Sequence, residues 1–243
     1  MTVFRRLKNS LRQNGLRMSI LKLCLPIYDL GFDIKYQIDT CKWATLDNLT
    51  IKGDNEDQGA KYQPTRIFRL RKLFSHIKPM IASNSVFVDL GCGKGRALCI
   101  ASEFGFKEVI GVEFAHELCN IARNNCAGYN RVKGFKTEFR IINSDVVDYK
   151  FNNNENVFFM YNPFNEIVMK SCLNNIIATL EKQPRKILII YCNPRHKDII
   201  EQYPAFVKVL DLDLWAQPFV IYSNAELSGH SNNSLLPKHN LRA

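Results

Sequence analysis

The chain lacks the features that mark a metal site, a disulfide framework or a membrane anchor. Its eight cysteines form no C-x-x-C pair, and no His/Cys cluster has zinc-binding spacing. No stretch reaches the roughly 18 uncharged residues of a membrane span, and Arg17 and Lys22 interrupt the apolar residues where a signal peptide needs an unbroken run. There is no internal repeat and no aromatic RNA-binding segment. We expect reduced thiols, no metal, and a soluble cytoplasmic protein.

Acidic residues are scarce in the first third of the chain. Residues 1–79 contain 15 Lys/Arg against 7 Asp/Glu, a net charge of +8, whereas residues 80–243 contain 18 against 16, a net charge of +2. Such a segment suits phosphates, an anionic membrane surface or an acidic protein, although a solvated basic helix without a partner has the same composition. We expect this third to recruit an acidic or phosphate-bearing partner and to contribute little to binding of a cofactor.

The first residues have the pattern of a basic amphipathic helix. Apolar side chains recur at helical spacing over residues 3–25, and basic residues lie mostly on the other face. The pattern predicts a helix that is broken by Gly15 or ended by Pro26, with an apolar stripe that docks on its own domain or on a membrane. The polar residues 47–59 indicate a loop or linker. We therefore predict an extension and linker (1–59), one domain (60–223) and a disordered tail (224–243).

Beyond residue 60 the sequence alternates between strand and helix patterns. Predicted helices cover Thr65–Ile77, Ala97–Phe104, His116–Asn125 and Glu166–Leu180. Apolar runs predict buried strands at Ser85–Leu90, Glu108–Glu113, Phe139–Asn143, Val157–Tyr161 and Lys186–Cys192. Two more strands are predicted at Phe206–Leu212 and Phe219–Tyr222, the second antiparallel at the sheet edge. The alternation indicates an α/β fold with a seven-stranded, mostly parallel sheet and helices on both faces.

A glycine-rich loop follows the first predicted strand of the sheet. Residues 86–96 read V-F-V-D-L-G-C-G-K-G-R, a buried strand that ends in an acid and a G-x-G-x-G loop leading into a helix. Glycines let such a loop turn tightly and approach a ligand, and nucleotides bind at this end of the first strand of open α/β sheets. Glu113 ends the next strand, 18 residues after Gly95, where it can accept hydrogen bonds from ribose hydroxyls. The alternative is a glycine-rich connection without a ligand.

The charges around this loop favour a cationic ligand over a pyrophosphate. A dinucleotide-binding loop requires a third glycine at position 96, which Arg96 occupies. Asp89 precedes the first glycine by two residues, where it repels a pyrophosphate and attracts an aminoacyl sulfonium. S-adenosylmethionine is therefore favoured over NAD. An NAD-type oxidoreductase and a non-catalytic binding module that keeps the cofactor fold remain as alternatives.

The glycine-loop motif resembles the first motif of the class I S-adenosylmethionine-dependent methyltransferases, and the likeness extends over about residues 60–223. The resemblance implies a Rossmann-like domain in which Asp89 and the loop hold the methionine part of the cofactor. The loop residues implied are Gly91, Cys92, Gly93 and Gly95. It also implies that Glu113 binds the ribose and that Asp145 contacts the adenine amino group, although an Asp at position 145 also suits a loop cap.

Asn162-Pro163-Phe164, after the fourth strand, resembles the Asn/Asp-Pro-Pro-Phe/Tyr signature of the amino-group methyltransferases. The resemblance implies that these three residues form the catalytic site and that the acceptor atom is nitrogen, but the signature has two prolines and this chain has one. A structural Asn-Pro turn is the alternative. Protein amines, RNA bases and small metabolites are all open as acceptors. In related enzymes the segment containing Tyr62 and Thr65 contacts the cofactor, whereas Thr65 also suits a helix N-cap.

Overall fold

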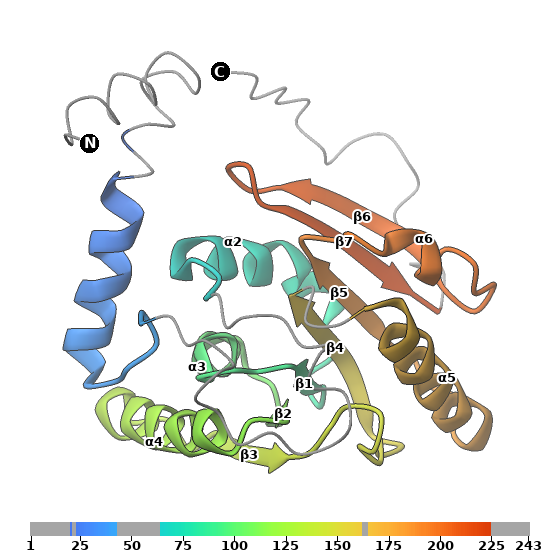
Figure 1. The fold of residues 1–243 in the computed structure, drawn as a ribbon, viewed down its shortest axis with the longest axis horizontal. Helices are drawn as coiled ribbons and strands as arrows, with labels where there is room; N and C mark the ends of the chain where they lie inside the picture. Colours follow the sequence, from blue (N-terminus) through green and yellow to red (C-terminus); the bar gives the residue numbers. More distant parts are fainter. Residues whose placement is uncertain (1–19, 21–22, 43–63, 162–164, 225–243) are drawn as a thin grey trace.

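The computed structural model describes residues 20, 23–42, 64–161 and 165–224. Its centre is a seven-stranded sheet with the order β3-β2-β1-β4-β5-β7-β6 (Figure 1). The strands are β1 (Val86–Leu90), β2 (Glu108–Glu113), β3 (Glu138–Asn143), β4 (Glu155–Tyr161), β5 (Leu188–Cys192), β6 (Val207–Asp213) and β7 (Pro218–Ser223).

Strands β1 to β5 are parallel to one another, and β7 pairs antiparallel with both β5 and β6. The predicted mostly parallel sheet is confirmed, and its antiparallel strand is β7, which enters between β5 and the edge strand β6. The five residues of β1 are all buried, as are those of β5, which explains their continuous apolar runs. The carboxyl ends of β1, β2, β4 and β5 consequently meet at one edge of the sheet.

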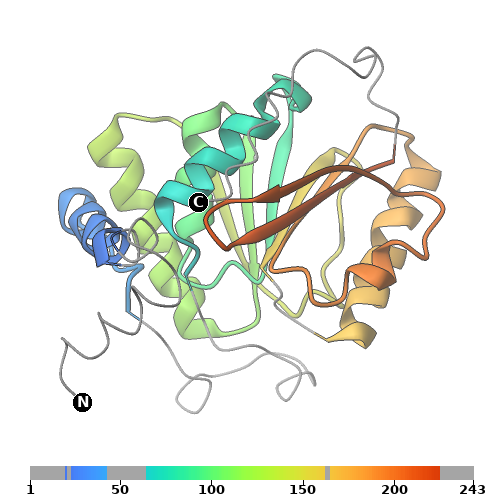
Figure 2. The ribbon, with the colours of Figure 1, turned by 90° about the horizontal axis from the view of Figure 1, so that it is seen from above.

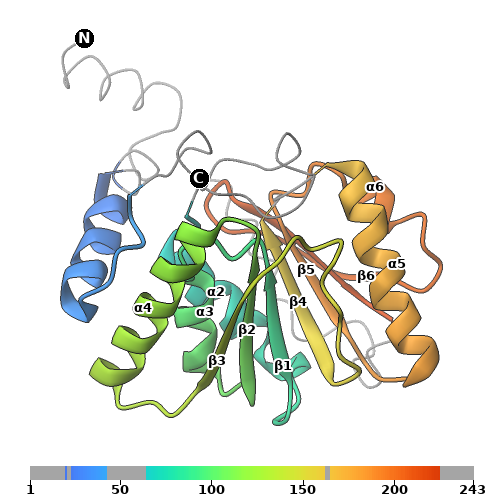
Figure 3. The same ribbon diagram turned by 60° about the horizontal axis from the view of Figure 1, so that its bottom comes forward.

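Helices cover both faces of the sheet (Figures 2 and 3). They are α2 (Ile67–Ile77), α3 (Arg96–Ala101), α4 (His116–Lys133), α5 (Glu166–Lys182) and α6 (Lys197–Ile200), with short 3₁₀ turns η3 (Lys78–Met80) and η4 (Ser102–Phe104). One apolar core lies between the sheet and α2, α3 and α4, and a second lies between the sheet and α5 and α6. No helix in the described part of the chain is long and apolar enough to cross a membrane.

An additional helix covers residues 23–36 and packs beside α4 (Figure 2). Phe32 and Tyr36 are buried and contact the ring of Tyr129 on α4, with centroids 5.5 and 4.7 Å away. Asp29 is 0% exposed and accepts hydrogen bonds from Arg66 and Arg96, both at 3.0 Å. Buried aromatic rings and a buried ion pair make this helix part of the core of the same domain.

Four boundary predictions differ from the structure. Residues 23–36 are helical, so Pro26 does not end a helix. Helix α4 continues to Lys133, beyond the predicted end at Asn125, because its buried face continues as far as Tyr129 before Gly134 (φ 69°) caps it.

The other two differences concern hydrogen bonds at element ends. Helix α2 has Arg66 as its N-cap residue, so the interpretation of Thr65 as the N-cap is wrong. Asn224, predicted to begin a disordered tail, accepts from the Ile187 N–H and donates to the Arg185 carbonyl, both at 2.8 Å. The Asn224 side chain therefore fastens the end of β7 to the start of β5.

Candidate functional site

The glycine loop turns between the end of β1 and the start of α3. Gly91, Gly93 and Gly95 all have positive φ (84°, 53° and 79°), a conformation that side chains with a Cβ rarely adopt. The Gly91 and Cys92 N–H groups donate to the carbonyl of Val112 on β2, at 2.9 and 3.0 Å. These bonds fix the loop across the carboxyl ends of the two central strands, which is the nucleotide-binding edge of open α/β sheets.

Glu113 ends β2 with its carboxylate turned into this loop. Its two oxygens accept from the Gly93 N–H at 2.8 Å and the Ala115 N–H at 3.0 Å. Burial raises the pKa of Glu113, although these backbone hydrogen bonds oppose the rise. The Phe114 N–H also bonds to this carboxylate. A carboxylate offers about four acceptor sites, so roughly one remains for a ribose hydroxyl.

The Asp89 carboxylate is buried without a hydrogen-bond donor among the described residues. It is 3% exposed, and burial together with the charge of Glu113 raises its pKa well above the ordinary value. A buried acid without a donor or cation is unfavourable by itself. The site therefore fits a ligand that brings a positive charge, as the aminoacyl sulfonium of S-adenosylmethionine does, and disfavours an anionic pyrophosphate.

The remaining predicted cofactor residues are only partly described. Asp145 is buried after β3, and its Oδ1 accepts from the Val147 N–H at 3.0 Å, as expected of a loop-capping Asp. Thr65 is 6% exposed, and its side chain hydrogen bonds to the thiol of Cys192 on β5. Tyr62 and the Asn162-Pro163-Phe164 segment lie outside the described residues.

Residues 39–41, which follow the helix of residues 23–36, form a clamp of hydrogen bonds and an ion pair with the glycine loop and the start of α3. Lys94 of the loop forms an ion pair with Asp39 at 3.1 Å, and Arg96 donates from Nε to the Thr40 hydroxyl at 2.8 Å. The Asn125 side chain of α4 donates to the carbonyls of both Asp39 and Lys94. These contacts join the N-terminal third to the glycine loop, whereas the sequence analysis places that third apart from the loop. Sequence analysis missed the clamp because its partners lie 55 to 86 residues apart.

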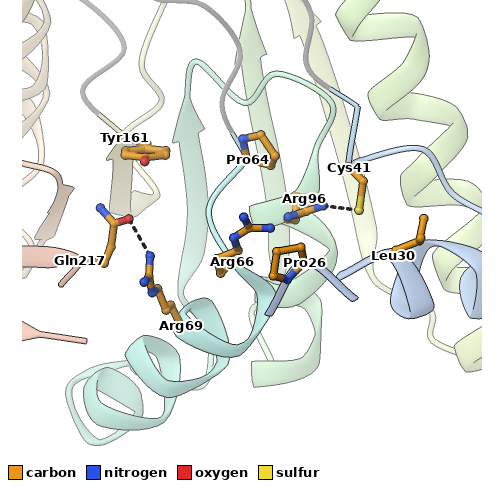
Figure 4. A pocket seen from close by; sticks show the side chains of 9 residues that line it. All are labelled: Pro26, Leu30, Cys41, Pro64, Arg66, Arg69, Arg96, Tyr161 and Gln217. Carbon is orange, nitrogen blue, oxygen red and sulfur yellow. Dashed lines mark hydrogen bonds between the residues drawn. The ribbon is translucent and has the colours of Figure 1, made fainter. Parts of the chain in front are cut away.

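A pocket of about 360 Å³ opens beside the carboxyl end of β4 (Figure 4). Tyr161, the last residue of β4, forms part of its wall, and Gln217 closes it at the turn before β7. The rest of the wall comes from Pro26, Leu30, Cys41, Pro64, Arg66, Arg69 and Arg96. The pocket therefore adjoins the glycine loop on the side of β4, away from Glu113. Arg66, Arg69 and Gln217 were not predicted as site residues.

The fold and the loop define the chain as a nucleotide-binding α/β domain of the class I methyltransferase type. Residues 81–222 match the methyltransferase domain family, which is more than half of the chain, and the chain belongs to that family. It is a methyltransferase with S-adenosylmethionine as its cofactor. Membership in this family decides against the NAD-type oxidoreductase and the non-catalytic module. No curated protein sequence matches the chain.

Solved methyltransferase structures share the fold at low sequence identity. The "putative methylase HI0767" from Haemophilus influenzae is 20% identical with a TM-score of 0.50, covering 66% of this chain and 99% of that one. The "putative methyltransferase yhhF" from Escherichia coli is 17% identical with a TM-score of 0.50, covering 67% and 87%. An RNA methyltransferase from Salinibacter ruber, in complex with S-adenosyl-L-homocysteine, is 17% identical with a TM-score of 0.47, covering 71% and 100%. These likenesses concern the fold alone.

Proposed function

We propose that this methyltransferase transfers the methyl group to a nitrogen atom of an acceptor bound in the pocket beside β4. The observation that carries the proposal is the position of Tyr161, which lines the pocket and immediately precedes Asn162 in the sequence. The Asn162 amide oxygen can accept a hydrogen bond from an amino group, as can the carbonyl of Pro163. Phe164 supplies an aromatic surface for the acceptor.

The cofactor residues have separate parts in this proposal. The buried Asp89 carboxylate attracts the positive charge of the aminoacyl sulfonium, while the glycine loop approaches the methionine part without Cβ atoms. Glu113 accepts from a ribose hydroxyl with the capacity that its backbone hydrogen bonds leave, and Asp145 accepts from the adenine amino group. Tyr62 and Thr65 cover the methionine part from the segment before α2.

The chemical step requires alignment more than acid-base catalysis. When bound, S-adenosylmethionine supplies an electrophilic methyl group on a positively charged sulfur. Asn162 and Pro163 hold the acceptor nitrogen with its lone pair toward that methyl group, and the pocket wall excludes water. A neutral amine needs no general base before it attacks, so the proton that it carries afterwards can pass to solvent.

The test measures methyl transfer from labelled S-adenosylmethionine to fractions of a cell extract and identifies the methylated atom. Asn162→Ala should bind S-adenosylhomocysteine normally and lose turnover, because the interaction is made chiefly in the transition state. The control is Asn153→Ala, a matched change at an exposed residue before β4. Methylation on oxygen or carbon, or full activity of Asn162→Ala, would mean that Asn162-Pro163-Phe164 is only a structural turn.

A further inference from the structure

The pocket beside β4 has an excess of positive charge. Among the described residues, nine line the pocket; they include Arg66, Arg69 and Arg96, and none of the nine is Asp or Glu. The carboxylate behind them is Asp29, whose Oδ2 is shared by Arg66 and Arg96 at 3.0 Å each. Figure 4 shows Arg66 between the other two guanidinium groups. Asp29 offsets part of the charge of Arg66 and Arg96 and does not pair with Arg69, so the described lining of the pocket is cationic.

The three arginines differ in how many of their N–H donors are already used. Arg96 is almost fully buried and donates to Asp29, Thr40, Cys41 and the Thr65 carbonyl, which identifies it as a structural residue. Arg66 donates only to Asp29 among the described residues, and 37% of its side chain is exposed. Because a guanidinium has five N–H donors, Arg66 retains most of its capacity.

Arg69 is the arginine in this pocket whose guanidinium has no acidic hydrogen-bond partner among the described residues. It donates to the Gln217 side chain at 3.3 Å and to the Trp215 carbonyl at 2.6 Å, both uncharged acceptors, while its buried Nε has no partner. Burial lowers the pKa of Arg69, and the positive charge of Arg66 lowers it further, while Tyr161, Cys192 and Asp213 oppose this change. An anion between the two guanidinium groups would relieve both effects.

We propose that the methyl acceptor is a small molecule with a carboxylate or phosphate group, and that Arg66 and Arg69 bind this anionic group. The volume of about 360 Å³ suits a small ligand, since such sites span roughly 300–1,000 Å³. Pro26, Leu30 and Tyr161 offer an apolar wall to the rest of the molecule. This inference rests on the proposed function, because it places the acceptor in the same pocket.

The methionine carboxylate of the cofactor is the competing occupant. The pocket wall extends from Arg96 to Tyr161 on β4 and to Gln217, whose amide donates to Cys192 at the end of β5. In the sheet order, β4, β5 and β7 lie on one side of β1, and Glu113 on β2 lies on the other. The pocket therefore extends away from the ribose side of the cofactor loop, and Arg69 lies at its far end beside Gln217. This position favours the acceptor.

The experiment measures anion binding directly, without turnover. Trp215 contacts Arg69 through its carbonyl and packs on Phe68 at 4.7 Å, so its fluorescence reports on this pocket once the other tryptophan is replaced (Trp43→Phe). The probes are inorganic phosphate and benzoate, titrated at constant ionic strength with chloride as the balancing anion. A saturable response to phosphate indicates a phosphoryl acceptor, and one to benzoate indicates a carboxylate acceptor.

Arg69→Gln should weaken the binding of the preferred probe at least tenfold, and Arg69→Lys should weaken it less because the charge remains but the planar fork is lost. Arg131→Gln, the same change at an exposed residue of α4, should leave it unchanged. Thermal unfolding of each variant shows whether a loss of binding is caused by misfolding. If Arg69→Gln is misfolded, the variants Arg69→Lys and Arg66→Gln serve as the test in its place.

The final measurement repeats the titration with saturating S-adenosylhomocysteine. Retained probe binding assigns the arginines to the acceptor, whereas competition assigns them to the cofactor carboxylate and overturns the inference. No saturable response to either probe, or an equal response in Arg69→Gln, also overturns it. Failure to bind S-adenosylhomocysteine at all is a different result, which contradicts the proposed function and not the anion site.

Discussion

Asp89 and Glu113 end neighbouring strands, yet their carboxylates have different surroundings. Glu113 is supported by the Gly93 and Ala115 N–H groups, whereas Asp89 has no donor among the described residues. Both acids were predicted because a strand end beside a glycine loop is a local pattern. The arginine pocket was not predictable in this way: Arg69 and Gln217 are 148 residues apart, and only the completed sheet brings them together.

Asp89→Asn should weaken cofactor binding and stabilise the protein. Burial raises the Asp89 pKa, so above the ordinary value of 3.8 the ionised carboxylate disfavours the folded state. Removing that charge should raise the midpoint of thermal unfolding, by about 2–4 °C for each kcal/mol gained in a chain of this size. Differential scanning calorimetry and titration with S-adenosylhomocysteine check the two effects. A less stable variant would show that Asp89 has a partner in the ligand-free protein.

Cofactor affinity should rise with pH in the wild-type protein. A bound cation favours the ionised Asp89 and lowers its raised pKa, so binding releases a proton until the pH exceeds the pKa of the free protein. Calorimetric titrations with S-adenosylmethionine in buffers of different ionisation enthalpy measure this release. Asp89→Asn should show less of it, with Glu113, whose pKa is also raised, contributing the rest. Equal proton release in both proteins would show that a group other than Asp89 loses the proton when the cofactor binds.

Glu113→Ala should weaken cofactor binding by about 1.5–3 kcal/mol, the contribution of hydrogen bonds to a charged group. The same change removes the acceptors of the Gly93 and Ala115 N–H groups, so the variant should also be less stable. Calorimetric titration below the unfolding transition separates the two effects. A variant that binds S-adenosylhomocysteine like the wild-type protein would exclude a ribose contact.

Among the structural elements, the strands follow the sequence most closely. Each predicted strand overlaps an observed one with ends that differ by at most two residues, because continuous apolar runs mark buried parallel strands. Helix ends were less predictable: the residues of α4 after Asn125 include Gly128, which weakens the helical pattern, although it lies against Gln37 and Ile38 in the structure. Contacts between distant segments decide such boundaries.

The turn between β6 and β7 is strained, and relieving it should stabilise the protein. Trp215 and Ala216 both have positive φ, 55° and 59°, without being glycine. Ala216→Gly should raise the free energy of unfolding by about 0.5–1 kcal/mol. The left-handed conformation costs a residue with a Cβ about 1–2 kcal/mol, and the higher backbone entropy of glycine in the unfolded chain offsets part of the relief. Chemical denaturation measures the gain. Ala178→Gly, in the exposed face of helix α5, should instead lose about 1 kcal/mol.

At the scale of the whole molecule, the N-terminal segment and the catalytic domain form one unit. The helix of residues 23–36 carries Asp29 into contact with Arg66 and Arg96, and residues 39–41 hold the glycine loop through Lys94 and Arg96. Amphipathic spacing in the sequence shows that such a segment can form a helix, but it does not show which surface the helix contacts. The net charge of the first third likewise could not reveal that two of its arginines line a pocket.

Deleting residues 1–45 should therefore unfold or strongly destabilise the protein, because Arg96 would remain buried without its carboxylate and Tyr129 would lose its contacts with the rings of Phe32 and Tyr36. Loss of one partner of a buried ion pair alone costs about 3–5 kcal/mol, which corresponds to roughly 6–20 °C in the midpoint of thermal unfolding. Deleting residues 1–19 removes five basic residues but keeps Asp29 and the clamp on the loop, so stability and affinity for S-adenosylhomocysteine should stay near wild type. Thermal unfolding and calorimetric titration of both truncations distinguish the effect of removing the basic residues from the effect of removing the packed helix. If the longer truncation remained folded and bound the cofactor normally, the segment would be an independent extension, and its basic residues would be free to serve a partner.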